Sequence, residues 1–286
     1  MGRLDGRVAF ITGGARGQGR AIALRFAAEG ADIIICDVCE TGSVPYPLAT
    51  EADLKETAEG VRTAGVRCVA EVADVRSQES LDAVVARGVD EFGRLDVACA
   101  NAGIFWSASL TEMTTEVWET VIGVNLTGAW HTTKAVAPQM IDQQNGSLIY
   151  TVSTNGWHGG YSYSAYTASK HGVAGLMKCA ALELGRHGIR ANALLPGAVN
   201  SPMMVNAYSK EFVTGSADSS DERLDHQVRH NTILPGRRML PPEAVADAAL
   251  WLASDESQHV TGAEITVDAG HTRLPHYNWD PLDEPI

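Results

Sequence analysis

The chain has 286 residues, of which 45% are hydrophobic and 20% charged, and its formal net charge at pH 7 is -13. This composition predicts one soluble domain with a large core, and the negative charge disfavours nucleic acid, whose phosphates would be repelled. No apolar run approaches the ~18 residues that a membrane span needs, and neither a secretion signal nor a disulfide framework is indicated, so we expect a cytosolic protein.

Short apolar runs typical of buried strands alternate with helical patterns along the chain. We expect strands at residues 8–12, 32–37, 67–73, 95–100, 146–152, 189–195 and 263–267, and helices at 17–29, 51–64, 77–91, 114–140, 164–187 and 241–253. This alternation predicts an α/β fold in which helices cover both faces of a seven-stranded parallel sheet. Right-handed crossovers then give a single Rossmann-type doubly wound domain over residues 1–270, with one crevice at its switch point.

The first expected strand runs directly into a glycine-rich turn, Gly13-Gly-Ala-Arg-Gly17-Gln-Gly19, before a helix. Glycines let backbone amides approach a pyrophosphate, and a helix amino terminus favours negative charge. The next strand ends at Asp37, where a carboxylate can accept hydrogen bonds from both ribose hydroxyls of an adenosine and would repel a 2′-phosphate. These features favour NAD over NADP, although Arg16 is either a ligand for that phosphate or a solvated turn residue.

Four polar residues between positions 125 and 170 point to proton transfer at an alcohol oxygen. A helix places the phenol of Tyr166 and the ammonium of Lys170 on one face, and the cation would lower the phenol pKa from its usual ~10 towards that of a general base. Ser153 would emerge at the carboxyl end of a strand and donate to the substrate oxygen, and Asn125 can hold a water that returns the proton to solvent.

Together, these residues resemble the short-chain dehydrogenase/reductase family over residues 6–270, through the motifs Thr12-Gly-x-x-x-Gly17-x-Gly19, Asn101-Ala-Gly103, Asn125, Ser153, Tyr166-x-x-x-Lys170 and Pro196-Gly197. The resemblance implies reversible hydride transfer between NAD and a secondary alcohol or ketone. It also implies a cofactor-binding set: Gly13, Ala15, Arg16, Gly17, Gln18, Gly19, Asp37, Asp74, Val75, Asn101, Ala102, Gly103, Tyr166, Lys170, Pro196, Gly197, Val199 and Ser201. By the resemblance, Asp74 and Val75 flank the adenine, and residues 196–199 border the nicotinamide.

The segment at residues 38–50 is longer than an ordinary strand-to-helix connection. It resembles the insertion of the carveol dehydrogenase-like, mycofactocin-coupled subfamily. That resemblance implies that the insertion covers an NAD which does not exchange freely, and that an external redox carrier reoxidises the NADH in place. The alternative is a surface loop stiffened by Pro45 and Pro47.

Helical periodicity weakens over residues 201–235, where methionines and aromatic residues are followed by acidic residues, and we expect a mobile lid there. The expected pocket suits a bulky apolar alcohol. The subfamily resemblance implies a terpenoid alcohol such as carveol. The candidate substrate residues of the pocket, which could instead pack in the core or at a subunit contact, are Phe105, Trp157, His158, Tyr161, Met203 and Met204. No metal site is expected, because the pair His226-x-x-x-His230 lacks a third ligand.

The tail at residues 271–286, with three prolines and two aromatic rings, is expected to be irregular and either to cross a subunit boundary or to be a disordered end. The family resemblance implies a homotetramer. Three alternatives stay open: an NADP-dependent ketone or acyl-thioester reductase of the same fold, a catalytically silent dinucleotide-sensing regulator, and a scaffold subunit. The last two would not need all four polar residues.

Overall fold

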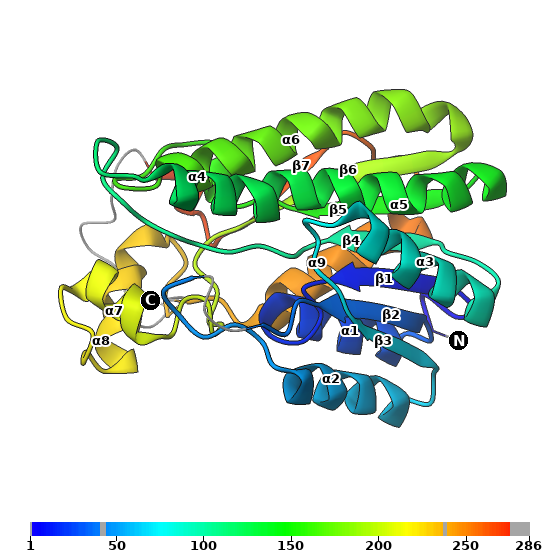
Figure 1. The fold of residues 1–286 in the computed structure, drawn as a ribbon, viewed down its shortest axis with the longest axis horizontal. Helices are drawn as coiled ribbons and strands as arrows, with labels where there is room; N and C mark the ends of the chain where they lie inside the picture. The colour runs from blue at the N-terminus through cyan, green and yellow to red at the C-terminus, as the bar shows by residue number, and fades with distance from the viewer. Residues whose placement is uncertain (1, 41–43, 237–238, 275–286) are drawn as a thin grey trace.

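The computed structural model describes residues 2–40, 44–236 and 239–274. One parallel sheet of seven strands forms its centre, in the order β3-β2-β1-β4-β5-β6-β7 (Figure 1). The strands are β1 (Val8–Thr12), β2 (Asp32–Asp37), β3 (Cys68–Val72), β4 (Val97–Ala100), β5 (Gly146–Thr151), β6 (Ile189–Pro196) and β7 (Glu264–Val267). The α/β, Rossmann-type prediction is confirmed, because the strands appear in the predicted places and the sheet is covered on both faces.

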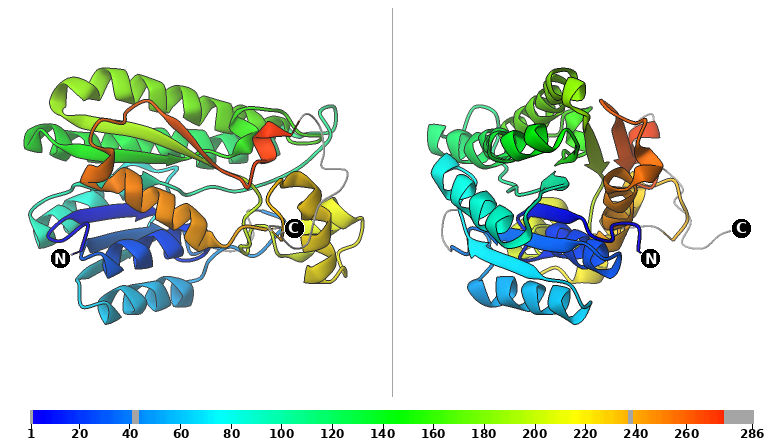
Figure 2. Two further views of the ribbon diagram at one scale, coloured as in Figure 1. Left: turned by 180° about the vertical axis from the view of Figure 1, so that it is seen from behind. Right: turned by 90° about the vertical axis from the view of Figure 1, so that its right-hand side faces the viewer.

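Two helical layers sandwich this sheet, as Figures 1 and 2 show. The helices are α1 (Gly17–Ala28), α2 (Glu51–Thr63), α3 (Gln78–Phe92), α4 (Thr115–Ile122), α5 (Gly128–Gln143), α6 (Ser164–Leu184), α7 (Ala207–Thr214), α8 (Asp221–Val228) and α9 (Pro242–Ala253). Strand β2 shows why its sequence is continuously apolar. Ile33 and Ile35 pack with Phe26 of α1, whereas Ile34 points to the other face and packs with Leu81 of α3.

The predicted helix at 114–140 is interrupted. Helix α4 ends at Ile122, a π-helical turn occupies Gly123–Thr127, and α5 then continues to Gln143. In this wider turn the amide of Gly128 donates to the carbonyl of Gly123, five residues back. A Cβ on Gly128 would lie 2.6 Å from Cγ2 of Val75, so close packing requires glycine there. The π turn buries the side chain of Asn125 at the sheet crevice.

The expected irregular lid at 201–235 contains two short helices, α7 and α8, which lie beyond the carboxyl ends of the strands (Figure 1). Each begins with a capping side chain: Asn206 accepts a hydrogen bond from the amide of Ser209, and Ser220 from that of Arg223. These caps explain why helices form where the apolar periodicity is weak.

Two further predictions concern segments that are described only in part. Of the tail at 271–286, His271–Arg273 forms a 3-10 turn, and the remainder from 275 lies outside the described residues. Of the insertion at 38–50, residues 41–43 likewise lie outside them. Among the helices that are described, none is both long and apolar enough to cross a lipid bilayer.

Candidate active site

A cavity of about 580 Å³ opens at the carboxyl ends of the strands. Chain segments that follow β1, β2, β4, β5 and β6 all line it, together with the insertion and the lid helix α7. In the sheet, β2 and β3 lie on one side of β1, and β4 to β7 lie on its other side. The strand order therefore reverses between β1 and β4, and the cavity lies at this switch point, where doubly wound folds bind ligands.

The glycine turn forms one end of this cavity, through Gly13, Gly17, Gln18 and Gly19. A Cβ on Gly19 would lie 2.0 Å from the carbonyl oxygen of Gly13, and Gly13 itself has φ +67°, so the turn can close in this way only with glycine. Helix α1 has no acidic residue in its first turn and no side-chain cap at Arg16. Its amino terminus therefore offers uncompensated positive potential to an anion in the cavity.

Asp37 lies on the cavity wall at the end of β2. Its Oδ2 accepts a hydrogen bond from the amide of Ala15 at 3.1 Å and its Oδ1 one from Val38 at 2.9 Å. Burial raises the pKa of this carboxyl more than the two bonds lower it. The prediction that Ala15 binds the cofactor is not supported, because Ala15 is fully buried, spends its amide on Asp37 and is absent from the cavity lining.

Arg16 lines the cavity, but the insertion holds its guanidinium, which donates to the carbonyl of Pro47 at 2.7 Å. Neither of the two roles considered for it, phosphate ligand or solvated turn residue, describes this contact. The arginine connects the glycine turn to the insertion instead.

The loop after β4 is fastened to the glycine turn. The hydroxyl of Thr12 accepts hydrogen bonds from the amides of Asn101 and Ala102, both at 3.1 Å, and the Asn101 side chain donates to the carbonyl of Thr12 at 3.0 Å. A Cβ on Gly103 would lie 3.3 Å from Oδ1 of Asn125. The remaining predicted cofactor residues that line the cavity are Asp74, Val75, Pro196, Gly197, Val199 and Ser201.

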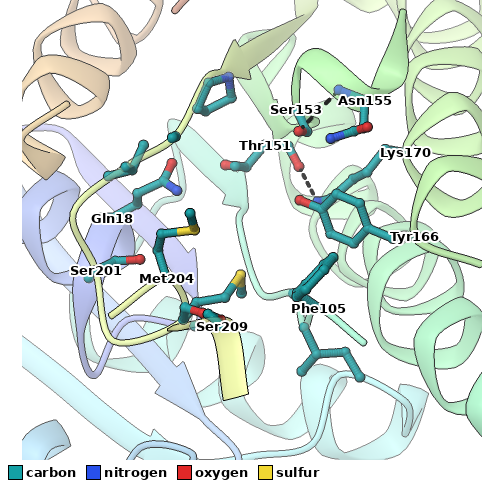
Figure 3. A pocket seen from close by; sticks show the side chains of 18 of the residues that line it. Gln18, Phe105, Thr151, Ser153, Asn155, Tyr166, Lys170, Ser201, Met204 and Ser209 are labelled. Atoms are coloured by element: carbon teal, nitrogen blue, oxygen red, sulfur yellow. Dashed lines mark hydrogen bonds between the residues drawn. The ribbon is translucent and has the colours of Figure 1, made fainter. Parts of the chain in front are cut away.

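Tyr166, Ser153 and Lys170 lie close together on one side of the cavity, as Figure 3 shows. The Lys170 ammonium donates to the carbonyl of Thr151 at 2.8 Å and lies 5.6 Å from the centroid of the Tyr166 ring. The Ser153 hydroxyl accepts a hydrogen bond from the Asn155 amide at 3.2 Å. This arrangement sets two hydroxyls and one amine around a space where an alcohol oxygen can bind.

The predicted direction of the Tyr166 pKa is wrong for this site. Burial raises the pKa of the phenol, and a hydrogen bond with the Ser153 side chain offsets this only in part. Lys170 is also fully desolvated, which lowers its pKa to about 8, so its positive charge is itself costly here. The sequence showed which two groups are neighbours but not how much water both lose.

The Asn125 side chain makes three hydrogen bonds within the protein, and its predicted part in a water relay stays a prediction. Its Oδ1 accepts from the amide of Ile104 at 2.8 Å, and its Nδ2 donates to the Ile104 carbonyl at 3.0 Å and to the Ser169 hydroxyl at 3.1 Å. Through these three bonds, Asn125 joins the π turn to the β4 loop and to α6. It is a positioning residue for the loop that carries Phe105.

Of the candidate substrate residues, Phe105, His158, Tyr161, Met203 and Met204 line the cavity. Tyr161 is 98% exposed and so can contribute only at the rim. Trp157 is not part of the lining, and its prediction is corrected. Its indole donates to the carboxylate of Glu264, and the guanidinium of Arg273 lies 4.8 Å above its ring, so these two partners hold it outside the cavity.

Several lining residues were missed in the sequence, namely Tyr46, Leu48, Asn155, Tyr163 and His271. Phe212 and Val213 also line the cavity, and both belong to the segment at 201–235 that was expected to supply pocket residues. Tyr163 stands three residues before Tyr166, a helical spacing that could have indicated a shared face. The ring of Phe105 lies 5.5 Å from that of Tyr166, 5.0 Å from Tyr163 and 5.8 Å from Phe212. These rings form an apolar wall beside the reactive hydroxyls.

Comparison with known proteins agrees with this geometry. The chain is 41% identical over 280 residues to (-)-trans-carveol dehydrogenase of Rhodococcus erythropolis, which covers 95% of this chain and 99% of the relative. Carveol dehydrogenase from Mycobacterium avium, solved in complex with NAD, superposes with a TM-score of 0.92 at 40% identity, over 96% of this chain and 100% of that one. A short chain dehydrogenase from Mycobacterium paratuberculosis, bound to NAD, gives 0.86 at 45% identity with the same coverage.

The family model for short chain dehydrogenases matches residues 7–212, which include the glycine turn, Asp37 and the meeting point of Ser153, Tyr166 and Lys170. With this match, the chain belongs to the short-chain dehydrogenase/reductase family of oxidoreductases.

Proposed function

We propose that the protein is an NAD-dependent dehydrogenase that interconverts a bulky, mainly apolar secondary alcohol and its ketone. One observation supports this most strongly: the Tyr166 phenol, beside Ser153 and Lys170, lines the same cavity as the glycine turn and Asp37. A dinucleotide bound along that cavity would reach a site equipped for proton transfer.

The residues present fit NAD. The amino terminus of α1 and the glycine turn suit a pyrophosphate, and Asp37 still has acceptor capacity for ribose hydroxyls beside its two backbone bonds. Arg16 is tied to the insertion through one of its five N–H donors, so the choice of NAD rests on Asp37, which would repel a 2′-phosphate. The solved relatives that hold NAD support the same choice over NADP. When bound, NAD supplies the group that accepts the hydride.

The chain's own residues would handle the proton. Tyr166 removes it from the substrate hydroxyl, and Ser153 orients that oxygen through its hydroxyl. Because burial raises the phenol pKa, the phenolate needs a positive charge nearby, and the Lys170 ammonium is the described cation closest to the ring. Its bond to the Thr151 carbonyl holds that charge in place.

The apolar wall of Phe105, Tyr163 and Phe212 suits a hydrocarbon skeleton, and the carveol dehydrogenases among the relatives favour a terpenoid alcohol such as carveol. The insertion favours retained NAD, since Tyr46 and Leu48 line the cavity and pack against its wall. Retained NADH would be reoxidised by an external carrier such as mycofactocin.

We further propose a cytoplasmic homotetramer. Large apolar side chains stay exposed on the helices that the family resemblance assigns to an interface: Trp118 on α4 is 41% exposed, Trp130 on α5 47%, and Leu182 on α6 83%.

A Tyr166→Phe variant tests the assignment. The ring and its packing against Phe105 remain, so NAD should still copurify, as measured by mass spectrometry and absorbance. Reduction of that NAD by carveol should fall by about 10²–10⁴-fold, the usual contribution of a general base. Tyr163→Phe, which removes a hydroxyl from the neighbouring ring, is the matched control, and its rate of NAD reduction should fall far less. Near-normal rates for Tyr166→Phe would contradict the mechanism, and tight binding of NADPH rather than NADH would favour the reductase alternative.

A further inference from the structure

The cavity has two walls of different chemistry. The wall described above is aromatic and apolar, and Met203 and Val213 extend it. A second part of the lining, which includes the neighbouring rings of His158 and His271 together with Asn155, carries polar side chains. A substrate that was only a hydrocarbon with one hydroxyl would leave this second wall without a partner, since Tyr166 and Ser153 already serve the reacting oxygen.

The two histidines come from distant parts of the chain, and both are held in place by their own backbones. His158 follows the 3-10 turn Thr154–Gly156, and its amide donates to the Thr154 carbonyl at 3.4 Å. His271 follows β7, in a turn fixed by Asp268, whose carboxylate accepts from the amides of Gly270 at 2.9 Å and Thr272 at 2.8 Å. The ring centroids of His158 and His271 lie 5.2 Å apart at an angle of 61°.

Neither imidazole makes a hydrogen bond to any residue that the structure describes. Both histidines are nevertheless partly buried, with more than half of their surface shielded from solvent. Burial lowers the pKa of both rings. The charge of His171 lowers the pKa of His158 further, and the charge of His158 does the same for His271. The carboxylate of Asp268 acts in the opposite direction on both rings. A neutral imidazole has one donor and one acceptor nitrogen. The pair can therefore bind a hydroxyl or a carbonyl oxygen without placing a charge in the cavity.

We propose that His158 and His271 bind a second, neutral oxygen of the substrate, a hydroxyl or a carbonyl, so that the preferred substrate is a bulky hydrocarbon carrying two oxygen functions. This inference rests on the proposed function, because the reacting oxygen must bind at Tyr166. The apolar wall then holds the carbon skeleton, and the histidine wall sets which end of it enters and rejects analogues that leave the imidazoles unpaired.

Two matched pairs of alcohols test the proposal, each differing only by a tertiary hydroxyl that cannot be oxidised. The first pair is menthol and p-menthane-3,8-diol, and the second is 4-isopropylcyclohexanol and 4-(2-hydroxypropan-2-yl)cyclohexanol. The two pairs place the second oxygen at different distances from the reacting one. Holoenzyme is mixed with each alcohol and an artificial electron acceptor, and kcat/KM is measured. We expect the diol of at least one pair to be preferred by about tenfold, the worth of one well-made hydrogen bond.

The preference should disappear in His158→Phe and His271→Phe and return in part in His158→Gln, which keeps a donor and an acceptor. His259→Phe, at an exposed histidine outside the cavity lining, is the control and should keep the wild-type ratio. If the wild type oxidises both members of each pair equally, or if the preference survives in both Phe variants, the second-oxygen proposal is overturned while the proposed function stands. If no alcohol reduces the bound NAD, the proposed function fails, and the inference with it.

Discussion

Replacing Tyr46 with phenylalanine should make bound NAD exchange faster. Tyr46 lies in the insertion, is 5% exposed and accepts a hydrogen bond from the Phe105 amide at 2.9 Å through its hydroxyl. Burial raises its pKa to about 12, so the hydroxyl stays neutral and the bond persists over the whole working pH range. The ring stacks on Tyr208 with centroids 6.3 Å apart, and phenylalanine preserves that contact. The substitution therefore removes one hydrogen bond and little packing.

The expected change in the exchange rate follows from the Phe105 amide, which loses its hydrogen-bond partner in the variant. A partly buried amide that loses its partner costs about 1–2 kcal/mol, towards the lower end of the range for unsatisfied donors. If the insertion must open to release NAD, the open population rises by the same free energy, or about 5–30-fold. Exchange of bound NAD for isotopically labelled NAD, followed by mass spectrometry, measures this rate directly.

Tyr208→Phe is the matched control for this experiment. It removes a hydroxyl from the stacked partner ring, but that hydroxyl contacts Ser107, at 2.8 Å from its amide and 3.0 Å from its carbonyl, and belongs to the lid helix α7. We expect a higher KM for the alcohol and a smaller rise in NAD exchange than Tyr46→Phe gives, because Tyr208 acts on the Tyr46 contact only through the shared segment at residues 105–107. If NAD exchange in Tyr46→Phe stays within about twofold of the wild-type rate, the hydrogen bond between Tyr46 and Phe105 does not hold the insertion closed over NAD.

Two further substitutions test the electrostatics and the backbone of the site. Because burial lowers the pKa of Lys170 from 10.5 to about 8, the unfolded chain binds more protons between those values. Stability of the cofactor-free protein should therefore rise by about 3 kcal/mol over that pH window, and Lys170→Met, measured by urea unfolding, should lack this rise; equal slopes would show that the lysine is hydrated. Gly19→Ala places a Cβ 2.0 Å from the Gly13 carbonyl oxygen, so we expect loss of copurifying NAD, and a full NAD content would contradict the tight turn.

The parts of the molecule that were predictable from sequence are those set by local patterns. The run from Ile33 to Ile35 is apolar because both faces of β2 are buried, and this holds wherever the strand lies in the sheet. The meeting of Tyr166 and Lys170 follows from helical spacing alone, and the glycine turn from its place between strand and helix.

The features that could not be predicted from the sequence depend on contacts between segments that are distant in the chain. The π turn at Gly123–Thr127 arises where Gly128 packs on Val75, a contact between distant segments. The upward shift of the Tyr166 pKa reflects burial by several elements, and a spacing argument shows only the neighbouring lysine. His271 was assigned to the tail and to a subunit boundary, yet the turn fixed by Asp268 brings it to the cavity.

The insertion that contains Tyr46 and the lid helix α7 are both anchored to the short segment at residues 105–107. Tyr46 of the insertion binds the Phe105 amide, and Tyr208 of the lid binds the backbone of Ser107, two residues further along. Between these anchors the Phe105 ring packs edge-on against Tyr166. Ordering this segment through either anchor lowers the entropic cost of ordering it through the other. Retention of the dinucleotide and closure over the alcohol should therefore favour each other, and the strand-following loop at residues 105–107 is the element that couples them.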